Sequence, residues 1–224
     1  MRSLLVLRPE PGAAATLVRA AAAGADAVAA PLFTIVPVAW TSPDPSAHDA
    51  LMLTSANAVR LAGPALATLL ALPLYAVGEA TAAVASAAGF ARIHAGSADA
   101  AALVTQMVAT GVKRPLHLAG RDHRAPDDAP IPIVRRIVYA ADPVAVLPQT
   151  AETALRNGAV ALLHSPRAGT LLAELAAKAG LDPTALRVAA ISAAAARDWP
   201  GAVVADRPTD DALLAAAATL CDKG

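Results

Sequence analysis

Five short turns in the sequence combine small residues with hydroxyl or arginine side chains, a combination suited to binding anions. They read Thr54-Ser55, Gly78-Glu79-Ala80-Thr81, Gly120-Arg121, Ser165-Pro166-Arg167 and Ser192-Ala193. A strand that enters a helix through such a turn leaves backbone N–H groups pointing outward, and these groups bind oxyanions. The same turns are also compatible with ordinary capped helices, because Ser is a good N-cap. The candidate binding residues are Arg8, Thr54, Ser55, Gly78, Thr81, Gly120, Arg121, Ser165, Arg167 and Ser192.

Signatures of several other chemistries are missing from the sequence. It contains neither G-x-G-x-x-G nor G-x-x-x-x-G-K-[ST], so dinucleotide and P-loop sites lose their main support. It has no G-x-S-x-G elbow, so Ser55 and Ser165 are interpreted as helix caps rather than nucleophiles. The five histidines show no metal-ligand spacing and have no cysteine partners, so we expect no metal site.

Composition narrows the class of protein further. The 18 basic and 18 acidic residues give a formal net charge of +0, without the basic excess typical of nucleic-acid binding. The longest apolar stretch is interrupted by Pro31 and Pro37 and is too short to span a bilayer. Cys221 is the single cysteine, which excludes an intramolecular disulfide. With no convincing export signal, we expect a cytoplasmic protein that binds neither nucleic acid nor membrane.

The elements that must position these turns follow an alternating strand–helix rhythm. Apolar strands without alternation, such as residues 4–7 and 159–163, are typical of a parallel sheet covered on both faces. Long helices are expected over residues 55–70 and 165–179, and a shorter helix is expected to open over residues 192–197. Other expected signals are helix stops at Gly24, Gly89, Gly111, Gly158 and Gly180, a cap at Ser97 or Asp99, and a cap at Thr209.

The rhythm occurs twice, which predicts two α/β domains. Ser55 and Ser165 occupy equivalent turns 110 positions apart, and Gly78 and Ser192 lie 114 apart. Two extended segments rich in β-branched residues, about 32–40 and 133–141, are candidate linkers. We therefore expect two α/β domains joined by these two segments, with the middle block inserted in the other domain. The predicted ranges are 1–36 with 142–224 for the discontinuous domain and 41–135 for the inserted one, with strand ends and helix starts facing a cleft.

Tyr139, one of two tyrosines, ends the second extended segment. A phenol stays protonated at neutral pH and can donate a hydrogen bond to an oxygen. The alternative is an aromatic side chain that only covers the sheet.

Several of these pieces, in this order and spacing, resemble the uroporphyrinogen-III synthase family over essentially the full chain. They are the opening Leu-Arg-Pro-Glu-Pro-Gly, Ala30-Pro31-Leu32-Phe33, Leu53-Thr54-Ser55-Ala56-Asn57-Ala58-Val59, Val77-Gly78-Glu79-Ala80-Thr81-Ala82, Val138-Tyr139, Ser165-Pro166 and Pro208-Thr209. The resemblance implies two Rossmann-like (flavodoxin-like) parallel-sheet domains joined by a two-stranded β-ribbon, the second inserted in the first. It also implies a cytoplasmic monomer that uses no metal or cofactor. It implies that hydroxymethylbilane, a linear tetrapyrrole, is cyclised to uroporphyrinogen III with loss of water and inversion of ring D. It also points to Tyr139 as a general acid toward the leaving hydroxyl.

The sequence departs from the family pattern at two places. The second Gly-x-x-Thr-Ala turn of the family is replaced by Ser192-Ala193-Ala194-Ala195-Ala196, so a threonine role at Ala195 is lost. The helix before the second extended segment is expected to be shortened by Pro126, Pro130 and Pro132. These departures leave two alternatives open: a binding module for tetrapyrroles or other polyanions without turnover, and a hinged binding protein for a small organic anion.

Overall fold

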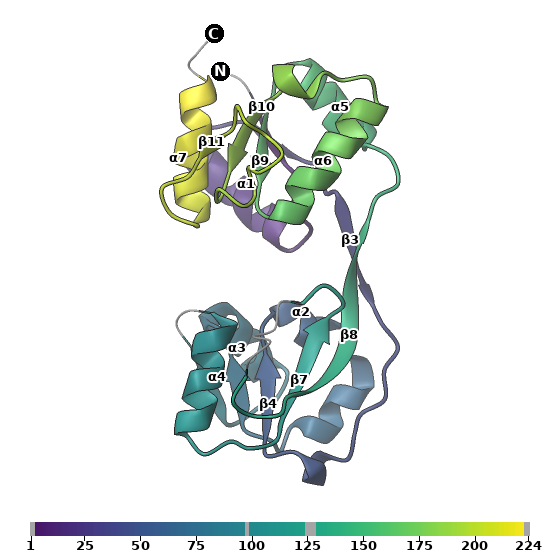
Figure 1. The fold of residues 1–224 in the computed structure, drawn as a ribbon, viewed down its shortest axis with the longest axis vertical. Helices are drawn as coiled ribbons and strands as arrows, with labels where there is room; N and C mark the ends of the chain where they lie inside the picture. The colour runs from purple at the N-terminus through teal and green to yellow at the C-terminus, as the bar shows by residue number, and fades with distance from the viewer. Residues whose placement is uncertain (1–2, 97–98, 124–128, 222–224) are drawn as a thin grey trace. The chain divides into compact units, whose positions relative to one another are not determined.

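The chain forms two compact units, each with its own largely parallel sheet. A computed structural model describes residues 3–96, 99–123 and 129–221 (Figure 1). Unit 1 comprises Met1–Thr34 and Asp142–Gly224, and unit 2 comprises Ile35–Ala141. Both chain crossings fall inside strands that are neighbours in a sheet, β3 (Phe33–Pro37) and β8 (Val134–Pro143).

Unit 1 is built on a five-stranded sheet of order β11-β10-β9-β1-β2, and every pairing in it is parallel. Its strands are β1 (Leu4–Val6), β2 (Ala27–Ala29), β9 (Val160–Leu163), β10 (Arg187–Ala190) and β11 (Val203–Val204). Its helices are α1 (Gly12–Ala22), α5 (Gln149–Arg156), α6 (Pro166–Lys178) and α7 (Asp210–Cys221), with a 3₁₀ turn at Pro183–Ala185. Leu4 and Val6 pack with α1 and α7 on one face, so the fully buried Leu5 points to the opposite face, where Figure 1 shows α5 and α6.

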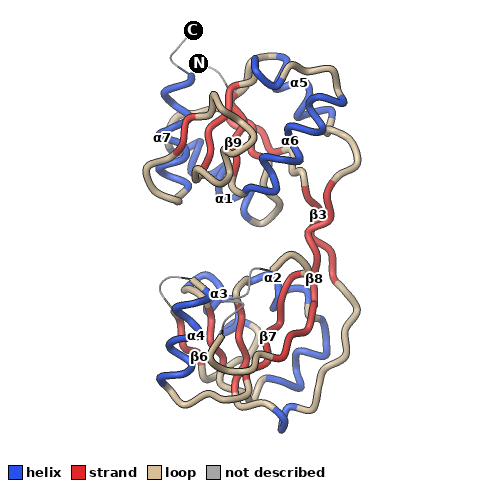
Figure 2. The backbone as a smooth tube through the Cα atoms, viewed as in Figure 1, coloured by secondary structure: helices blue, strands red, loops and turns tan. Residues whose placement is uncertain are grey.

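Unit 2 is built on a six-stranded sheet of order β3-β8-β7-β4-β5-β6 (Figure 2). Besides β3 and β8, its strands are β4 (Ala50–Leu53), β5 (Leu74–Ala76), β6 (Ile93–Ala95) and β7 (Pro115–Gly120). Its helices are α2 (Ala56–Leu61), α3 (Glu79–Ala87) and α4 (Ala100–Ala109), with 3₁₀ turns at Pro45–Ala47 and Gly63–Leu69. Alternate residues of β4 enter two cores: Leu51 and Leu53 pack with α2 and α3, and Met52 packs with α4. The expectation of an α/β protein with two parallel-dominated sheets is confirmed.

Local capping and stop signals agree with the structure in several places. All five glycines predicted to end helices have positive φ values, between +69° and +101°. Asp99 caps α4 by accepting a hydrogen bond from the Ala102 N–H at 2.9 Å, whereas the alternative cap Ser97 lies outside the described residues. The predicted helix shortening at Pro126 also lies outside them.

Two predicted helices are wrong. The helix expected over residues 55–70 stops at Leu61 and continues as a 3₁₀ turn, because Gly63 adopts φ +67° and Pro64 has no N–H to donate. The helix expected to open over residues 192–197 is a series of turns. Its continuation is blocked by Pro200, and the preceding Trp199 is buried, with its indole N–H bonded to the Gly169 carbonyl at 2.9 Å.

Among the described residues, no helix has the length and apolar character needed to span a bilayer.

Candidate functional site

Each sheet has a point at which the direction of winding reverses. In unit 1 this point lies between β1 and β9, and in unit 2 it lies between β4 and β7. In open parallel sheets ligands bind beyond the carboxyl ends of the strands at such points. In unit 1, Arg8 lies two residues after β1 and His164 directly follows β9. In unit 2, Thr54 directly follows β4 and Arg121 directly follows β7. Most of the predicted turns therefore lie at the expected edge of their own sheet.

In unit 2, the end of β4 carries Thr54 and Ser55. The Ser55 hydroxyl caps α2 by accepting a hydrogen bond from the Asn57 N–H at 3.2 Å. The Thr54 hydroxyl lies 3.1 Å from Nε2 of His117, a buried residue of β7. Thr54 is thus already hydrogen-bonded to a side chain of the neighbouring strand.

Tyr139 lies against Gly120 at the end of β7. The two residues are partners in the parallel pairing of β7 with β8, next to a register shift at Ala119. A Cβ atom on Gly120 would lie 2.6 Å from Cζ of Tyr139 and 2.8 Å from its hydroxyl oxygen, so only glycine leaves room for the phenol. The Arg121 N–H donates to the Tyr139 carbonyl at 2.9 Å. The three predicted residues Gly120, Arg121 and Tyr139 therefore form one contiguous group.

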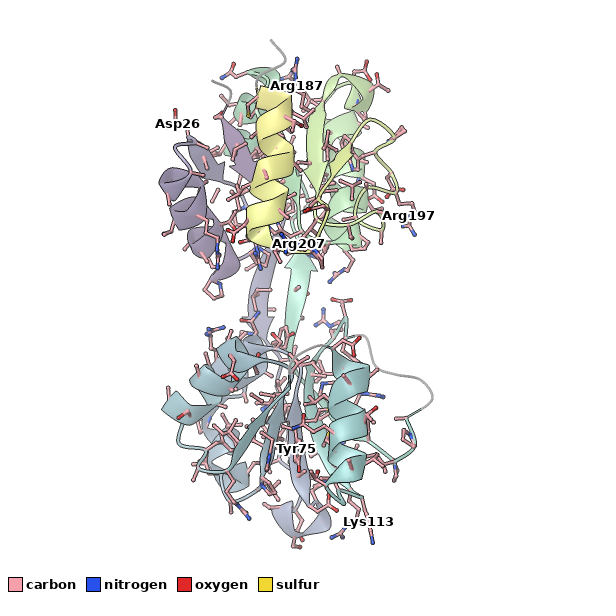
Figure 3. The ribbon with its side chains drawn as sticks, turned by 90° about the vertical axis from the view of Figure 1, so that its left-hand side faces the viewer. Asp26, Tyr75, Lys113, Arg187, Arg197 and Arg207 are labelled. Atoms are coloured by element: carbon pink, nitrogen blue, oxygen red, sulfur yellow. The ribbon has the colours of Figure 1, made fainter. Side chains whose placement is uncertain are left out.

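The other tyrosine, Tyr75, has a different environment. It is 3% exposed within the sheet of unit 2, where Figure 3 labels it, and its ring stacks on His94 with centroids 4.6 Å apart. Its hydroxyl bonds Thr110 at 2.8 Å. Tyr75 is therefore a core residue, whereas Tyr139 is only partly buried and packs against the edge of the core that contains α2 and α3.

Gly78 and Thr81 lie after β5, at the start of α3. Gly78 occupies the N-cap position in an extended conformation, and a Cβ there would meet only the Gly96 carbonyl, at 4.0 Å. Thr81 is buried, and its N–H donates to the Gly78 carbonyl at 3.1 Å. The open backbone of this turn is thus the Gly78 side, while Thr81 faces the interior.

Two histidines in unit 2 join this edge, although no motif in the sequence pointed to them. His117 is 1% exposed; burial, together with the nearby Arg135 and His123, lowers its pKa from 6.5 to about 4, so it is neutral at pH 7. His123 packs edge-on against His117, with ring centroids 6.0 Å apart, and its Nδ1 lies 3.0 Å from the Gly120 carbonyl oxygen. Because these histidines lie more than 60 positions from Thr54 in the sequence, no short motif reveals that His117 contacts Thr54.

In unit 1, Arg8 has a carboxylate partner from the same chain. Its guanidinium lies against Gly12 and is 3.0 Å from Oδ1 of Asp210, the first residue of α7. The other Asp210 oxygen accepts hydrogen bonds from Arg19 at 3.1 Å and from the Thr16 hydroxyl at 2.8 Å. The Asp210 side chain is only 10% exposed, whereas the Arg8 side chain is 34% exposed. Arg8 therefore enters any ligand site as part of a charge cluster centred on a buried carboxylate.

His164, next to this cluster, is a second group that the sequence did not single out. Its side chain is 7% exposed, and Nε2 lies 3.2 Å from Oδ1 of Asp210. Within the described part of the chain, neither ring nitrogen makes a hydrogen bond of normal geometry. Burial, and after it the positive charge of Arg8, lowers the pKa of His164 to about 4 against the opposing effect of Asp210, so this ring is also neutral at pH 7.

The remaining predicted residues of unit 1 lie at helix and turn starts. Ser165 caps α6 by accepting from the Ala168 N–H at 3.2 Å, and Ser192 accepts from the Ala195 N–H at 3.3 Å. Arg167 is exposed, and its guanidinium lies 4.7 Å from the centre of the Phe33 ring. It borders a hollow of about 330 Å³ whose other lining residues are Phe33, Pro143, Pro166, Thr170, Leu171, Glu174 and Arg197.

These features define a class of protein: an α/β protein of two doubly wound units, with polar turns and helix starts at the carboxyl edge of each sheet. The model of the family described as uroporphyrinogen-III synthase HemD matches residues 14–215. The chain therefore belongs to the uroporphyrinogen-III synthase family, and this membership assigns it to tetrapyrrole biosynthesis.

A solved structure of a uroporphyrinogen III synthase shares the fold of this chain. A mutant uroporphyrinogen III synthase from the extremely thermophilic bacterium Thermus thermophilus is 18% identical, with a TM-score of 0.53 over 99% of this chain and 100% of that chain. The wild-type enzyme from the same organism, in another crystal form, is 17% identical, with a TM-score of 0.43 over 99% and 98% of the two chains. No curated protein sequence matches.

Proposed function

We propose that this chain closes hydroxymethylbilane to uroporphyrinogen III as a cyclising hydro-lyase, and that it works as a cytoplasmic monomer. The family match over residues 14–215 carries the proposal. In the reaction the C–O bond of the terminal hydroxymethyl group breaks, and the leaving hydroxyl takes a proton to become water. The resulting azafulvene is attacked by the substituted carbon of ring D. The spiro intermediate then breaks one bond and rejoins with ring D reversed, and a proton is lost.

The chemical demand on the protein is modest, since the pyrrole supplies the electrons that expel hydroxide. Catalysis then depends on holding the chain in the fold that favours attack through the substituted carbon. The substrate carries carboxylates along its length. Backbone N–H groups at Ser55, Gly78 and Ser165 and the side chains of Arg121 and Arg167 suit these anions.

Tyr139 is the proposed proton donor to the leaving hydroxyl. Its hydroxyl rests on the Gly120 backbone at the carboxyl end of β7, where glycine contributes no side chain to cover it. A neutral phenol can donate this hydrogen bond at physiological pH. We expect Tyr139→Phe to lower kcat by about 10- to 100-fold, at or below the low end of the range for general acids. The matched control is Tyr75→Phe, which removes a buried hydroxyl remote from the chemistry and should leave kcat unchanged.

The decisive assay supplies hydroxymethylbilane to the purified chain and resolves the isomers of the product. Uroporphyrinogen III in excess, formed faster than in the protein-free control, is the expected result. Formation of uroporphyrinogen I alone at the spontaneous rate would overturn the proposed function. A chain that binds the tetrapyrrole under those conditions would then be a binding module.

A further inference from the structure

A line of polar side chains connects the end of β4 with the Gly120 backbone on which Tyr139 lies. It starts at Thr54 on the end of β4, continues through His117 and His123, and ends at the carbonyl of Gly120. The proposed reaction uses Tyr139 but gives no role to either histidine.

The contact between His123 and Gly120 has a defined direction. A carbonyl oxygen only accepts hydrogen bonds, so Nδ1 of His123 must carry the proton and donate at 3.0 Å. The peptide between Gly120 and Arg121 already donates its N–H to the Tyr139 carbonyl at 2.9 Å. The His123 bond restrains the C=O end of the same peptide, and this second restraint matters for two reasons. Glycine has unusual backbone freedom, and the register shift between Ala119 and Gly120 interrupts the regular ladder to β8.

His117 supports His123 through the edge-on packing of their rings. It is almost fully buried, and the pairing registers place it between Met52 of β4 and Arg135 of β8. Its Nε2 is bonded to the Thr54 hydroxyl, which fixes the ring against which the His123 ring packs edge-on. The His123 ring is therefore bonded on one side and packed on the other.

We propose that His123, supported by His117, is a positioning residue that holds the Gly120 backbone and thereby the Tyr139 hydroxyl lying on it. The inference rests on the proposed role of Tyr139 in the reaction. The phenol is in contact with Gly120, so any rotation of the Gly120 peptide displaces the surface on which it lies. The two histidines act on the rate through geometry and not through contact with the substrate.

The kinetic test compares His123→Ala with His123→Asn, because the asparagine amide can replace Nδ1 as donor to the carbonyl. We expect His123→Ala to lower kcat by about 10-fold with KM changed less than about 2-fold, and His123→Asn to recover most of the loss. Combined with Tyr139→Phe, His123→Ala should cause no further loss, since both changes remove the same effect. An additive loss in the double variant would contradict the proposal.

His94→Ala is the matched control, because it removes the histidine that stacks on the unit's other tyrosine. It should leave kcat unchanged.

A second measurement does not depend on activity. The phenol lies over Gly120, so its ring current should shift the Gly120 Hα resonances in the NMR spectrum, and Tyr139→Phe should retain most of that shift. His123→Ala should reduce the shift, and His123→Asn should restore it. An unchanged shift in His123→Ala overturns the positioning role. A reduced shift with full activity supports that role but overturns the proposed chemistry of Tyr139.

Discussion

The two units are both doubly wound around a parallel-dominated sheet but differ in what occupies the carboxyl edge of that sheet. Each places a candidate side chain on a glycine: Arg8 on Gly12 in unit 1, and Tyr139 on Gly120 in unit 2. In unit 1 the neighbours are charged, and Asp210 binds both arginines of its cluster. In unit 2 the neighbours are the Thr54 hydroxyl, the neutral His117 ring, the His123 ring and backbone. Positive charge is also present there, at Arg135 near His117 and at Arg121 next to Gly120.

This difference indicates that the two edges contribute to different properties of the protein. An arginine that already has a carboxylate partner offers an incoming anion only part of its charge, so the edge of unit 1 depends on a balance between Arg8, Arg19 and Asp210. The carboxyl edge of unit 2 is instead organised by directional hydrogen bonds, such as the bond from Nδ1 of His123 to the Gly120 carbonyl. The charge cluster around Asp210 should therefore matter most for the stability of unit 1. The line of side chains from Thr54 through His117 and His123 to Gly120 should matter most for turnover.

The largest expected effect follows from removing the carboxylate at Asp210. We expect Asp210→Ala to lower the free energy of unfolding of unit 1 by about 2–3 kcal/mol, because the partly buried Arg8 and the exposed Arg19 lose their carboxylate partner. The buried Thr16 hydroxyl keeps only the Gly12 carbonyl as acceptor. Asp211→Ala is the matched control: it lies in the same helical turn, but it is 88% exposed and 3.9 Å from Arg19, so its loss should be below about 0.5 kcal/mol.

Denaturant unfolding can be followed for unit 1 alone. Trp199 is buried in unit 1 and Trp40 belongs to unit 2, so fluorescence in a Trp40→Phe background reports on Trp199. Equal losses for the two aspartate variants would contradict the charge-cluster interpretation.

The next effect concerns the two glycines. In Gly120→Ala the new methyl group must displace an aromatic ring, and we expect kcat to fall about 10- to 100-fold, as in Tyr139→Phe. In Gly12→Ala the new methyl group meets the flexible Arg8 side chain, so we expect a loss of about 1 kcal/mol in unit 1 and a much smaller loss of turnover. Gly201→Ala is the control, since nothing lies within 4 Å of its Cβ position and it should be neutral. Similar turnover losses in Gly12→Ala and Gly120→Ala would remove the contrast between the units.

The effect that is smallest at neutral pH, and that grows on acidification, is a pH dependence of stability that both units share. The folded-state pKa values of His164 and His117 are lowered from 6.5 to about 4, so between these pH values the unfolded chain binds the protons more readily. Stability should therefore fall as pH is lowered from about 6.5 to about 4, by up to about 1.4 kcal/mol per pH unit for each histidine. His164→Gln should flatten this slope in unit 1 alone and His117→Gln in unit 2 alone, as measured by the two tryptophans. A variant that leaves the slope of its own unit unchanged would show that its histidine does not cause it.

Local chemistry made much of the fold predictable. Strand runs without alternation indicated parallel sheets, and a glycine such as Gly180 ends a helix because it can adopt positive φ. The caps at Ser55 and Ser165 needed only two or three neighbouring residues. The helix expected at Ser192 was wrong because its outcome depended on burial of Trp199, which contacts α6.

The side-chain partners at the two edges could not be predicted in the same way. Asp210 meets Arg8 across 202 positions of the chain, and His117 meets Thr54 across 63. The His117 contact depends on strand order, which places β7 next to β4. The Asp210 contact depends on the packing of α7 beside α1 on one face of the sheet of unit 1. The turn residues were therefore visible in the sequence, whereas the groups that hold them required the sheet.

The strand order of unit 1 also has a consequence for synthesis of the chain. β1 lies between β2 and β9, but β9 begins only at Val160, after the whole of unit 2. Unit 2 is continuous in sequence and can fold while the ribosome is still making the rest of unit 1. Synthesis of the chain between β2 and β9 takes about 10 s at typical elongation rates, and the apolar strand β1 has one unpaired edge during that time. The nascent chain is most exposed to aggregation during this interval, before the C-terminal part of unit 1 emerges.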